Sequence, residues 1–191
     1  MTKRRNSVII VLLIIGVAAL CAVEIGFKPN IRHQRQHYAL ARLNPQTNDF
    51  NNIVKFKNPY VGNNSNDVNL NGNLPLANVP HTFSIDSTTR ELDVRYTKSE
   101  QDLGMAMSQF QASLVYNATA NFALIDNLNA ITFSFPGAAY HVTRTQVQAW
   151  YGVAPSKLSS EPTWKQKVQN KLSDLKYVTS AYQAFFGRTN N

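Results

Sequence analysis

Cysteine is the scarcest residue type in this 191-residue chain, because Cys21 alone represents it. A lone cysteine cannot form an intramolecular disulfide, and it cannot supply the paired thiolates of a structural zinc site. The folded part must therefore be stable through packing alone. Such cysteine usage is more typical of a bacterial cell-surface protein than of an animal secretory protein.

The chain also lacks the motifs on which common enzyme classes depend. Its eight glycines form no phosphate-binding loop, and no serine occupies a nucleophile-elbow context. His33 and His37 are four residues apart, as in zinc-binding pairs, but Gln34 stands beside His33 where a catalytic pair has glutamate. We therefore predict that the protein is not an enzyme and that it binds no metal or cofactor.

Three acidic residues near one predicted turn, Asp86, Glu91 and Asp93, come closest to a catalytic carboxylate pair. Alternating strand geometry points Glu91 and Asp93 to the same side, so a solvated sheet face is the simpler interpretation. His81 and His141 flank predicted strands, where polar structural roles are commoner than general-base catalysis. A cell-envelope hydrolase is kept as an alternative function.

Positive charge is concentrated at the two ends of the chain. The formal net charge is +8, of which residues 1–45 contribute +6, residues 46–155 contribute −2 and residues 156–191 contribute +4. The basic excess therefore lies beside the apolar first segment and at the C-terminus. Anionic lipid or wall polymer is the expected counterpart of such charge, and we predict no nucleic-acid partner.

An uninterrupted apolar run of 16 residues occupies positions 8–23. As a helix it would be about 24 Å long, against a hydrocarbon core of roughly 30 Å, and flanking residues up to Phe27 can extend it. Lys3, Arg4 and Arg5 precede the run, which predicts that the N-terminus stays inside and the remainder is exported. The predicted divisions are a cytoplasmic tail (1–7), a transmembrane anchor (8–27), a polar juxtamembrane stalk (28–48) and an extracytoplasmic domain (49–191).

Two other interpretations of the first segment stay open. A cleaved secretory peptide needs small residues before its cleavage site, and the stretch Ala19-Leu20-Cys21 meets this requirement poorly. Acylation of Cys21 would make a lipoprotein, but the large Leu20 stands where signal processing needs a small residue. An uncleaved anchor to the cell membrane is therefore the prediction.

The remainder, about 145 residues, is the size of one domain with a hydrophobic core. Apolar residues at helical spacing predict short helices at 50–56 and 63–74, a long helix at 108–127, a helix started by Thr143 or Thr145 and closed by Gly152, and a last helix at 159–187. Alternation predicts strands at 81–85, 92–96 and 131–135. The predicted fold class is α+β: an N-terminal transmembrane helix, then a small three-stranded, largely antiparallel sheet with a long crossing helix and a C-terminal amphipathic helix.

Three stretches of the chain resemble an uncharacterised family. They are Lys57–Ser65 with Leu74–Leu76, Asn117–Ala118 with Phe122–Asn127 and Ile131–Phe133, and Val142–Arg144 with Tyr151–Gly152. The chain is similar here to a bacterial domain of unknown function found in membrane-anchored proteins of Gram-positive bacteria. Related domains also accompany transmembrane zinc peptidases of the β-lactam-sensing antirepressor type. Because this chain has no peptidase segment, the resemblance implies a sensory or accessory domain and carries over no catalytic residue.

The best candidate binding surface combines a turn-rich loop with one basic and several aromatic residues. Its predicted members are Tyr60, Gly62, Asn63, Asn64, Arg144, Trp150 and Tyr151. Amide groups and aromatic rings on such loops can hold a peptide or a glycan. The opposing interpretation is structural: the glycine and the asparagines make the turn, and the aromatic side chains close the core.

Together these features favour a membrane-anchored extracytoplasmic domain that binds a protein or envelope ligand in a sensory or accessory role. Its expected partners are the membrane, through residues 8–27, and an envelope protein or wall polymer. A cell-envelope hydrolase or a regulator of one is the first alternative, and a structural spacer is the second.

Overall fold

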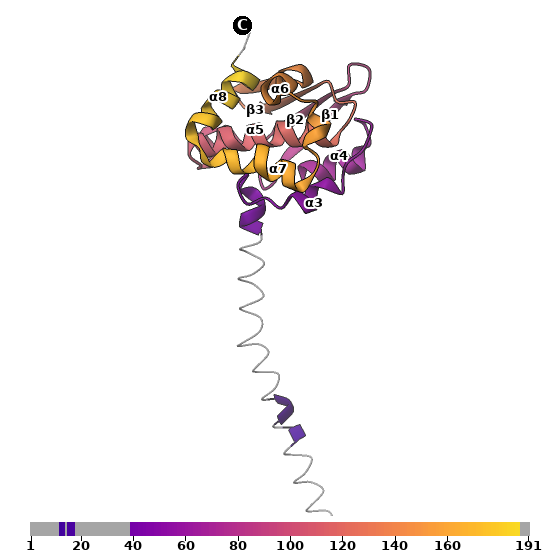
Figure 1. Cartoon of the computed structure of the whole chain (residues 1–191). Helices are drawn as coiled ribbons and strands as arrows, with labels where there is room; N and C mark the ends of the chain where they lie inside the picture. The colour runs from indigo at the N-terminus through magenta and orange to yellow at the C-terminus, as the bar shows by residue number, and fades with distance from the viewer. Residues whose placement is uncertain (1–11, 14, 18–38, 188–191) are drawn as a thin grey trace, which may run out of the picture. The chain divides into compact units, whose positions relative to one another are not determined.

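A computed structural model describes residues 12–13, 15–17 and 39–187 of the chain (Figure 1). Its contacts divide the chain into two compact units, Met1–Leu40 and Ala41–Asn191. The second unit holds the sheet and the hydrophobic core, and it also includes residues 41–48, part of the segment predicted as a stalk.

In the first unit, the described residues at 12–13 and 15–17 are helical. Every helix formed by described residues is too short or too polar to cross a bilayer. The predicted tail at 1–7, most of the predicted anchor at 8–27 and residues 28–38 of the predicted stalk lie outside the described residues. The described part of the chain therefore does not contain the transmembrane helix that the predicted fold class includes.

The second unit is built on a four-stranded mixed sheet, so the predicted three-stranded antiparallel sheet is wrong. Its strands are β1 (His81–Asp86), β2 (Glu91–Tyr96), β3 (Ala130–Phe135) and β4 (Ala138–Thr143), in the spatial order β1-β2-β3-β4. The β1–β2 and β3–β4 pairs are antiparallel, as in hairpins, whereas β2 and β3 are parallel. A helical crossover between neighbouring strands makes such a parallel pair, because the chain returns to the starting edge of the sheet.

The prediction missed strand β4, which follows β3 after a tight turn at Pro136 and Gly137. Gly137 adopts φ +87°, a conformation that a side chain disfavours, and the chain reverses there instead of leaving the sheet. In β4, Tyr140 and Val142 face the core while His141 is exposed. The alternation typical of a half-buried strand is therefore present, but weak beside two alanines.

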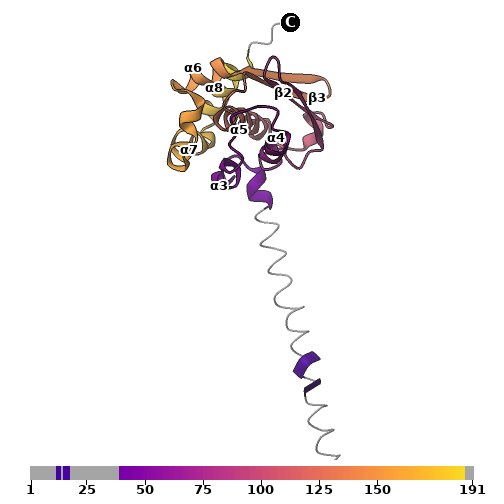
Figure 2. The same ribbon diagram turned by 90° about the vertical axis from the view of Figure 1, so that its right-hand side faces the viewer.

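Helix α5 (Met107–Leu124) connects β2 to β3 and lies at the centre of the core. Figure 2 shows this helix nearly end-on, with β2 and β3 on one side and α6, α7 and α8 on the other. All residues from Ala112 to Leu124 are buried, so the helix has no solvent face after its first turn. Polar side chains among them bond locally or across the core; Asn71 and Asn121 exchange two amide hydrogen bonds of 3.0 Å.

Two short helices precede the sheet, namely α3 (Phe50–Val54) and α4 (Asn64–Asn71). After β4 the chain forms α6 (Arg144–Tyr151). Thr143 caps α6 in a reciprocal capping box with Gln146, and Gly152 ends the helix at φ +68°. Of the two predicted starts, Thr143 and Thr145, the structure has Thr143, and the predicted end at Gly152 is confirmed.

The predicted C-terminal helix is broken into pieces: α7 (Glu161–Lys167), η4 (Gln169–Ser173) and α8 (Leu175–Phe186). Asp174 causes the last break, because its carboxylate accepts from the backbone N–H groups of Lys176 and Tyr177 and so starts a new helix. Trp164 of α7 is fully buried, whereas Leu175 is 64% exposed. One continuous helix would have placed both residues on the same apolar stripe.

Candidate functional site

The structure separates the predicted surface into two places, and Arg144 belongs to the first. Its guanidinium donates to three backbone carbonyls at the end of α5, those of Ile125 (2.6 Å), Leu128 (2.7 Å) and Phe122 (3.1 Å). Burial lowers the pKa of Arg144 and nearby Asp126 raises it, but a guanidinium stays protonated at neutral pH. Arg144 therefore satisfies the carbonyls that α5 leaves free, and its bonding capacity is used by the fold.

The loop before α4 packs on the same turn. The backbone N–H of Val61 donates to Asn127 Oδ1 at 2.6 Å, and that of Gly62 donates to Asp67 Oδ2 at 2.8 Å. Asp67 is fully buried, and burial raises its pKa while the hydrogen bonds from Gly62 and Asn58 lower it. The amide groups of the loop are thus also used by the fold, as the structural interpretation predicts.

The outward residues of this loop are accessible but do not converge on a cavity. Tyr60 is 67% exposed, and both Asn63 and Asn64 are exposed. None of them lines any of the three cavities considered below. This loop therefore offers separate exposed side chains and does not form a concave binding site with the three cavities.

Trp150 and Tyr151, at the end of α6, lie at the second place and line a groove of about 400 Å³. We call this cavity the lysine–aromatic groove. It is formed where α6 meets the junction of α7, η4 and α8, and it is lined by Trp150, Tyr151, Gln166, Lys167, Lys171 and Tyr177. The groove has the volume of a small-molecule site.

The aromatic wall of the groove is fixed by its own hydrogen bonds. Trp150 Nε1 donates to the Tyr177 hydroxyl at 3.1 Å, and the two rings meet at a centroid distance of 5.3 Å. The Tyr151 hydroxyl is 3.2 Å from Thr119 Oγ1. Burial raises the pKa of Tyr151 well above its usual value, so this hydroxyl is neutral and serves as a structural hydrogen-bonding group.

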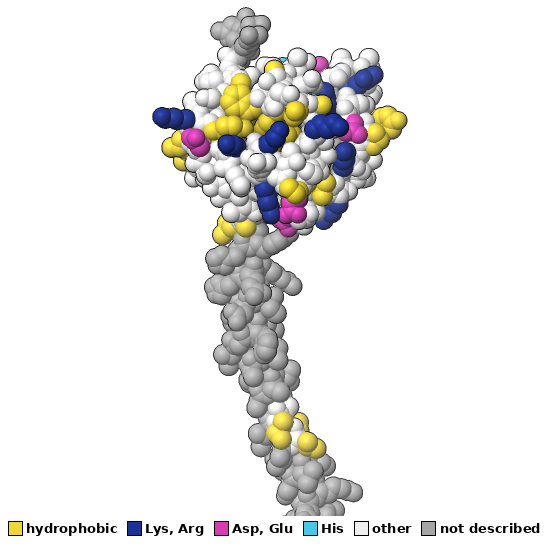
Figure 3. Space-filling model, viewed as in Figure 1, with side chains coloured by type: hydrophobic (Ala, Val, Ile, Leu, Met, Phe, Trp, Pro, Cys, Tyr) yellow, Lys and Arg dark blue, Asp and Glu magenta, His cyan; other side chains and the backbone are white. Residues whose placement is uncertain are grey.

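The polar side chains on the other side of the groove are unengaged. Lys167 and Lys171 are exposed, and neither ammonium forms an ion pair or a hydrogen bond with any residue that the structure describes. Gln166 is exposed beside them. Figure 3 shows basic side chains next to hydrophobic ones on the face that carries α7 and α8. Two ammonium groups over an aromatic wall create a positive concavity that suits an anion.

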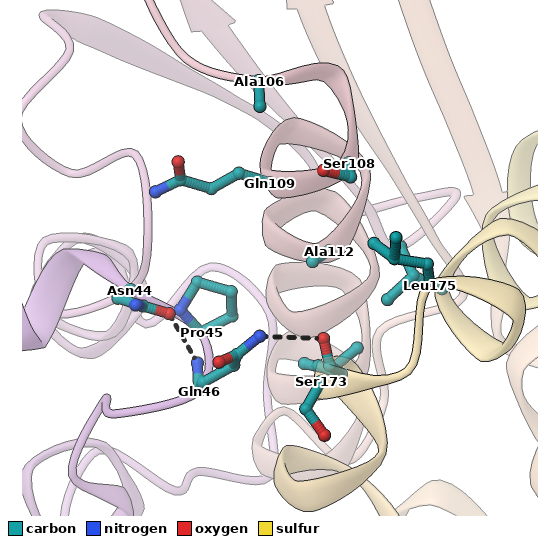
Figure 4. Close-up of a pocket in the computed structure, with 11 residues that line it drawn as sticks. Asn44, Pro45, Gln46, Ala106, Ser108, Gln109, Ala112, Ser173 and Leu175 are labelled. Atoms are coloured by element: carbon teal, nitrogen blue, oxygen red, sulfur yellow. Dashed lines mark hydrogen bonds between the residues drawn. The ribbon is translucent and has the colours of Figure 1, made fainter.

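A second cavity, of about 310 Å³, lies between residues 44–46, the start of α5 and the start of α8 (Figure 4). Its polar groups are already partly bonded: Gln46 Nε2 donates to the Leu172 carbonyl at 3.0 Å, and the Gln46 N–H donates to Asn44 Oδ1 at 2.9 Å. None of the described residues that line it is charged. It therefore offers less to a ligand than the lysine–aromatic groove does.

The residues considered for catalysis line none of the three cavities, although Asp86 and Glu91 lie opposite each other in the β1–β2 pair. Asp93 accepts hydrogen bonds from Arg95 (2.6 Å) and Ser134 (2.8 Å) on the open face of the sheet, and His141 pairs with Thr132 on that face. Asp86 accepts from two N–H groups of its own turn, and these bonds lower its pKa. His33, His37 and Cys21 lie outside the described residues. Within the described ranges, no group of three or more potential metal ligands occurs.

Sequence reasoning found Trp150 and Tyr151 but missed four groove residues, Gln166, Lys167, Lys171 and Tyr177. Two signals could have found them: the +4 charge of residues 156–191, and the position of Lys171 at the edge of an apolar stripe. The first signal predicted an anionic counterpart but no residues for it, and the assumption of one continuous helix hid the second, because it gave Lys171 no reason to share a cavity with Trp150.

The fold and site therefore define an α+β domain with a basic, aromatic-walled groove at its C-terminal side. Comparison with family models finds a domain of unknown function (DUF4825) at residues 53–145. The matched residues run from α3 to the start of α6, so they include Arg144 and the loop before α4 but end before the groove residues. No curated protein and no solved structure matches the chain.

Proposed function

We propose that the domain is a non-catalytic binding module of the cell envelope, which takes an anionic wall polymer into the lysine–aromatic groove. The observation that carries the proposal is the pair of unengaged ammonium groups, Lys167 and Lys171, beside the bonded wall of Trp150 and Tyr177. An anion gains from both charges, while an attached apolar or ring-bearing unit can contact the aromatic wall.

The chemistry of the three cavities supports binding over hydrolysis. None of the described residues in their linings carries a carboxylate or an imidazole, the groups that a glycosidase or an amidase needs at the scissile bond. Asp93 accepts a hydrogen bond from the Arg95 side chain, and Asp86 accepts one from the backbone N–H of Thr88. We therefore place the role in ligand capture, with a sensory or accessory output.

The proposal also assigns the domain to the outer side of the cell membrane, attached through residues 8–27. The sequence supports this assignment, because three basic residues, Lys3, Arg4 and Arg5, precede the apolar run. An alkaline phosphatase fusion at the C-terminus should be active in intact cells. A fusion that is produced but inactive would place the domain in the cytoplasm and remove the wall polymer as its ligand.

The binding test uses the full chain in detergent micelles and isothermal titration with an anionic wall polymer. Replacing both groove lysines (Lys167→Gln with Lys171→Gln) should weaken binding at least about tenfold, the equivalent of roughly 1.4 kcal/mol. The matched control, Lys55→Gln with Lys98→Gln, removes the same charge from exposed positions elsewhere and should change binding less than about twofold.

Equal losses in the two variants would mean diffuse attraction to a basic protein and would contradict a specific site. Absence of binding to any anionic polymer would contradict the proposed function itself. Because exposed charges are screened, the measurement should be repeated at 0.05 M and 0.3 M salt, where the specific component is expected to persist in part.

A further inference from the structure

Another cavity shares the lining residue Trp150 with the lysine–aromatic groove. This cavity has a volume of about 710 Å³ and lies between α6 and the end of α8. We call it the amide cavity; it is lined by Thr143, Thr145, Gln146, Ala149, Trp150, Gln183 and Ala184. Trp150 belongs to both linings, so the two spaces meet at the indole.

The order of the two cavities follows from how α6 and α8 pack. Near the start of α6, Gln146 Nε2 donates to the carbonyl of Phe185, close to the end of α8, at 3.1 Å. Near the end of α6, Trp150 contacts Tyr177, close to the start of α8. The helices are therefore antiparallel, and both cavities lie along one seam. From Thr143 to Tyr151 the seam is about 12 Å long at 1.5 Å per residue.

The linings at the two ends of this seam differ in chemistry. None of the described residues that line the amide cavity carries a charge. Gln146 is occupied by its bonds to Thr143 and to the Phe185 carbonyl. Thr145 and Gln183, in contrast, are exposed, and the described structure shows no hydrogen bond of either side chain. A free hydroxyl and a free amide next to an indole suit a neutral, hydroxyl-rich ring.

We propose that the seam binds a sugar phosphate unit, with the sugar in the amide cavity against Trp150 and the phosphate between Lys167 and Lys171. This inference rests on the proposed function, because it assigns the anion to the lysines, and it adds the neutral half of the ligand. The seam has room for one such unit, since its two cavities lie on either side of a single indole ring.

The test compares four probes on the full chain in detergent micelles: a hexose, inorganic phosphate, a hexose 1-phosphate and its methyl phosphodiester. The hexose 1-phosphate should bind at least tenfold more tightly than inorganic phosphate, and the free hexose should bind most weakly. The phosphodiester represents an internal unit of a polymer. Comparable binding of the diester assigns the site to a polymer, whereas binding of the monoester alone assigns it to a free sugar phosphate.

Two pairs of substitutions separate this inference from the proposed function. Thr145→Ala with Gln183→Ala should reduce hexose 1-phosphate binding to the level of inorganic phosphate and leave inorganic phosphate binding unchanged. The control, Gln148→Ala with Thr179→Ala, changes exposed residues of the same helices outside both cavities and should have no effect.

Equal affinity for hexose 1-phosphate and inorganic phosphate, lost in the lysine variant, would overturn the sugar phosphate and leave the anion site standing. Affinity that is unchanged in the lysine variant would overturn the proposed function as well. The thermal unfolding midpoint of each variant should be measured alongside, so that a folding defect is recognised.

Discussion

Helix α6 carries predicted site residues at both of its ends, and the two ends use them in opposite ways. At the start, Arg144 donates to three backbone carbonyls and closes the end of α5. At the end, Trp150 forms a wall beside lysines that bond to no described residue. The lesson is that residue type alone does not mark a binding site. What marks it is hydrogen-bonding capacity that remains after the fold is complete.

The family match ends between the two ends of α6. Residues 53–145 include the start of α6 but not its end, so the matched domain holds the bonded end, and the groove is completed by α7, η4 and α8. Substitutions at the start of α6 should therefore affect stability, and substitutions at its end should affect ligand binding.

The largest effect is expected for Arg144→Met, which removes the side-chain donor of three carbonyls at and just after the end of α5. We expect a loss of about 3 kcal/mol in the free energy of unfolding. Urea denaturation of the full chain, followed by tryptophan fluorescence, measures it. Arg95→Ala is the control, because Arg95 is exposed and Asp93 is its only ion-pair partner among the described residues. A loss of about 0–1 kcal/mol in the free energy of unfolding is expected for this variant. Similar losses in both variants would contradict the structural role of Arg144.

The two tryptophans provide a sharper test, because each donates its indole N–H to a tyrosine hydroxyl. Trp164 is fully buried and bonds to Tyr116 at 3.3 Å, whereas Trp150 lines the groove. Trp164→Phe should cost about 2 kcal/mol of stability and leave binding unchanged. Trp150→Phe should weaken ligand binding about threefold to tenfold with a smaller change in stability. A reversed pattern in titration and denaturation would refute the assignment of the groove.

A smaller effect is expected for Gly62→Ala. Gly62 has φ +102°, and no atom lies within 4 Å of the position that a Cβ would occupy, so the cost is conformational and not steric. We expect about 1 kcal/mol of destabilisation and unchanged binding. Gly104→Ala should cost less, because φ +64° lies in the left-handed helical region that alanine can adopt. Weaker ligand binding in the Gly62 variant would show that the loop before α4 is part of the binding site.

The smallest effect is expected at Asp67. Burial raises the pKa of its carboxyl group above the ordinary value. A carboxyl group with a raised pKa in the folded state holds its proton more tightly there, so its contribution to stability falls as pH rises from the ordinary aspartate range. Asp67→Asn removes this titration. The stability of the native protein relative to this variant should therefore be greater at pH 4 than at pH 7 by urea denaturation. A difference that grows with pH would show that the bonds from Gly62 and Asn58 outweigh burial.

Local patterns predicted much of the fold. The hairpin of β1 and β2, the long helix and the cap at Thr143 all depend on residues near one another in the sequence, and the structure contains each of them. The fourth strand was missed because its two alanines weaken the apolar alternation. The parallel pairing of β2 and β3 depends on where α5 returns the chain, which local periodicity does not record.

The site was harder to predict than the fold for a related reason. Arg144 looked like a ligand-binding cation, because sequence cannot show that it lies beside three carbonyls at and just after the end of α5. Nothing in the sequence marks Lys167 and Lys171 as neighbours of Tyr177, because one continuous helix is expected there. The break at Asp174 turns the chain and brings Tyr177 to the same cavity as both lysines. Burial and unused bonding capacity are properties of the assembled core.

The junction at Thr143 has a consequence for how a ligand would arrive. Strand β4 ends at this residue, and the same residue caps α6, so no linker separates the sheet from the helix that lines both cavities. Hinge motion needs a few linking residues that can change their backbone angles, and no such residue lies between β4 and α6. The seam is thus preorganised: association should be a single step without a lid, and the free and ligand-bound backbones should superpose closely.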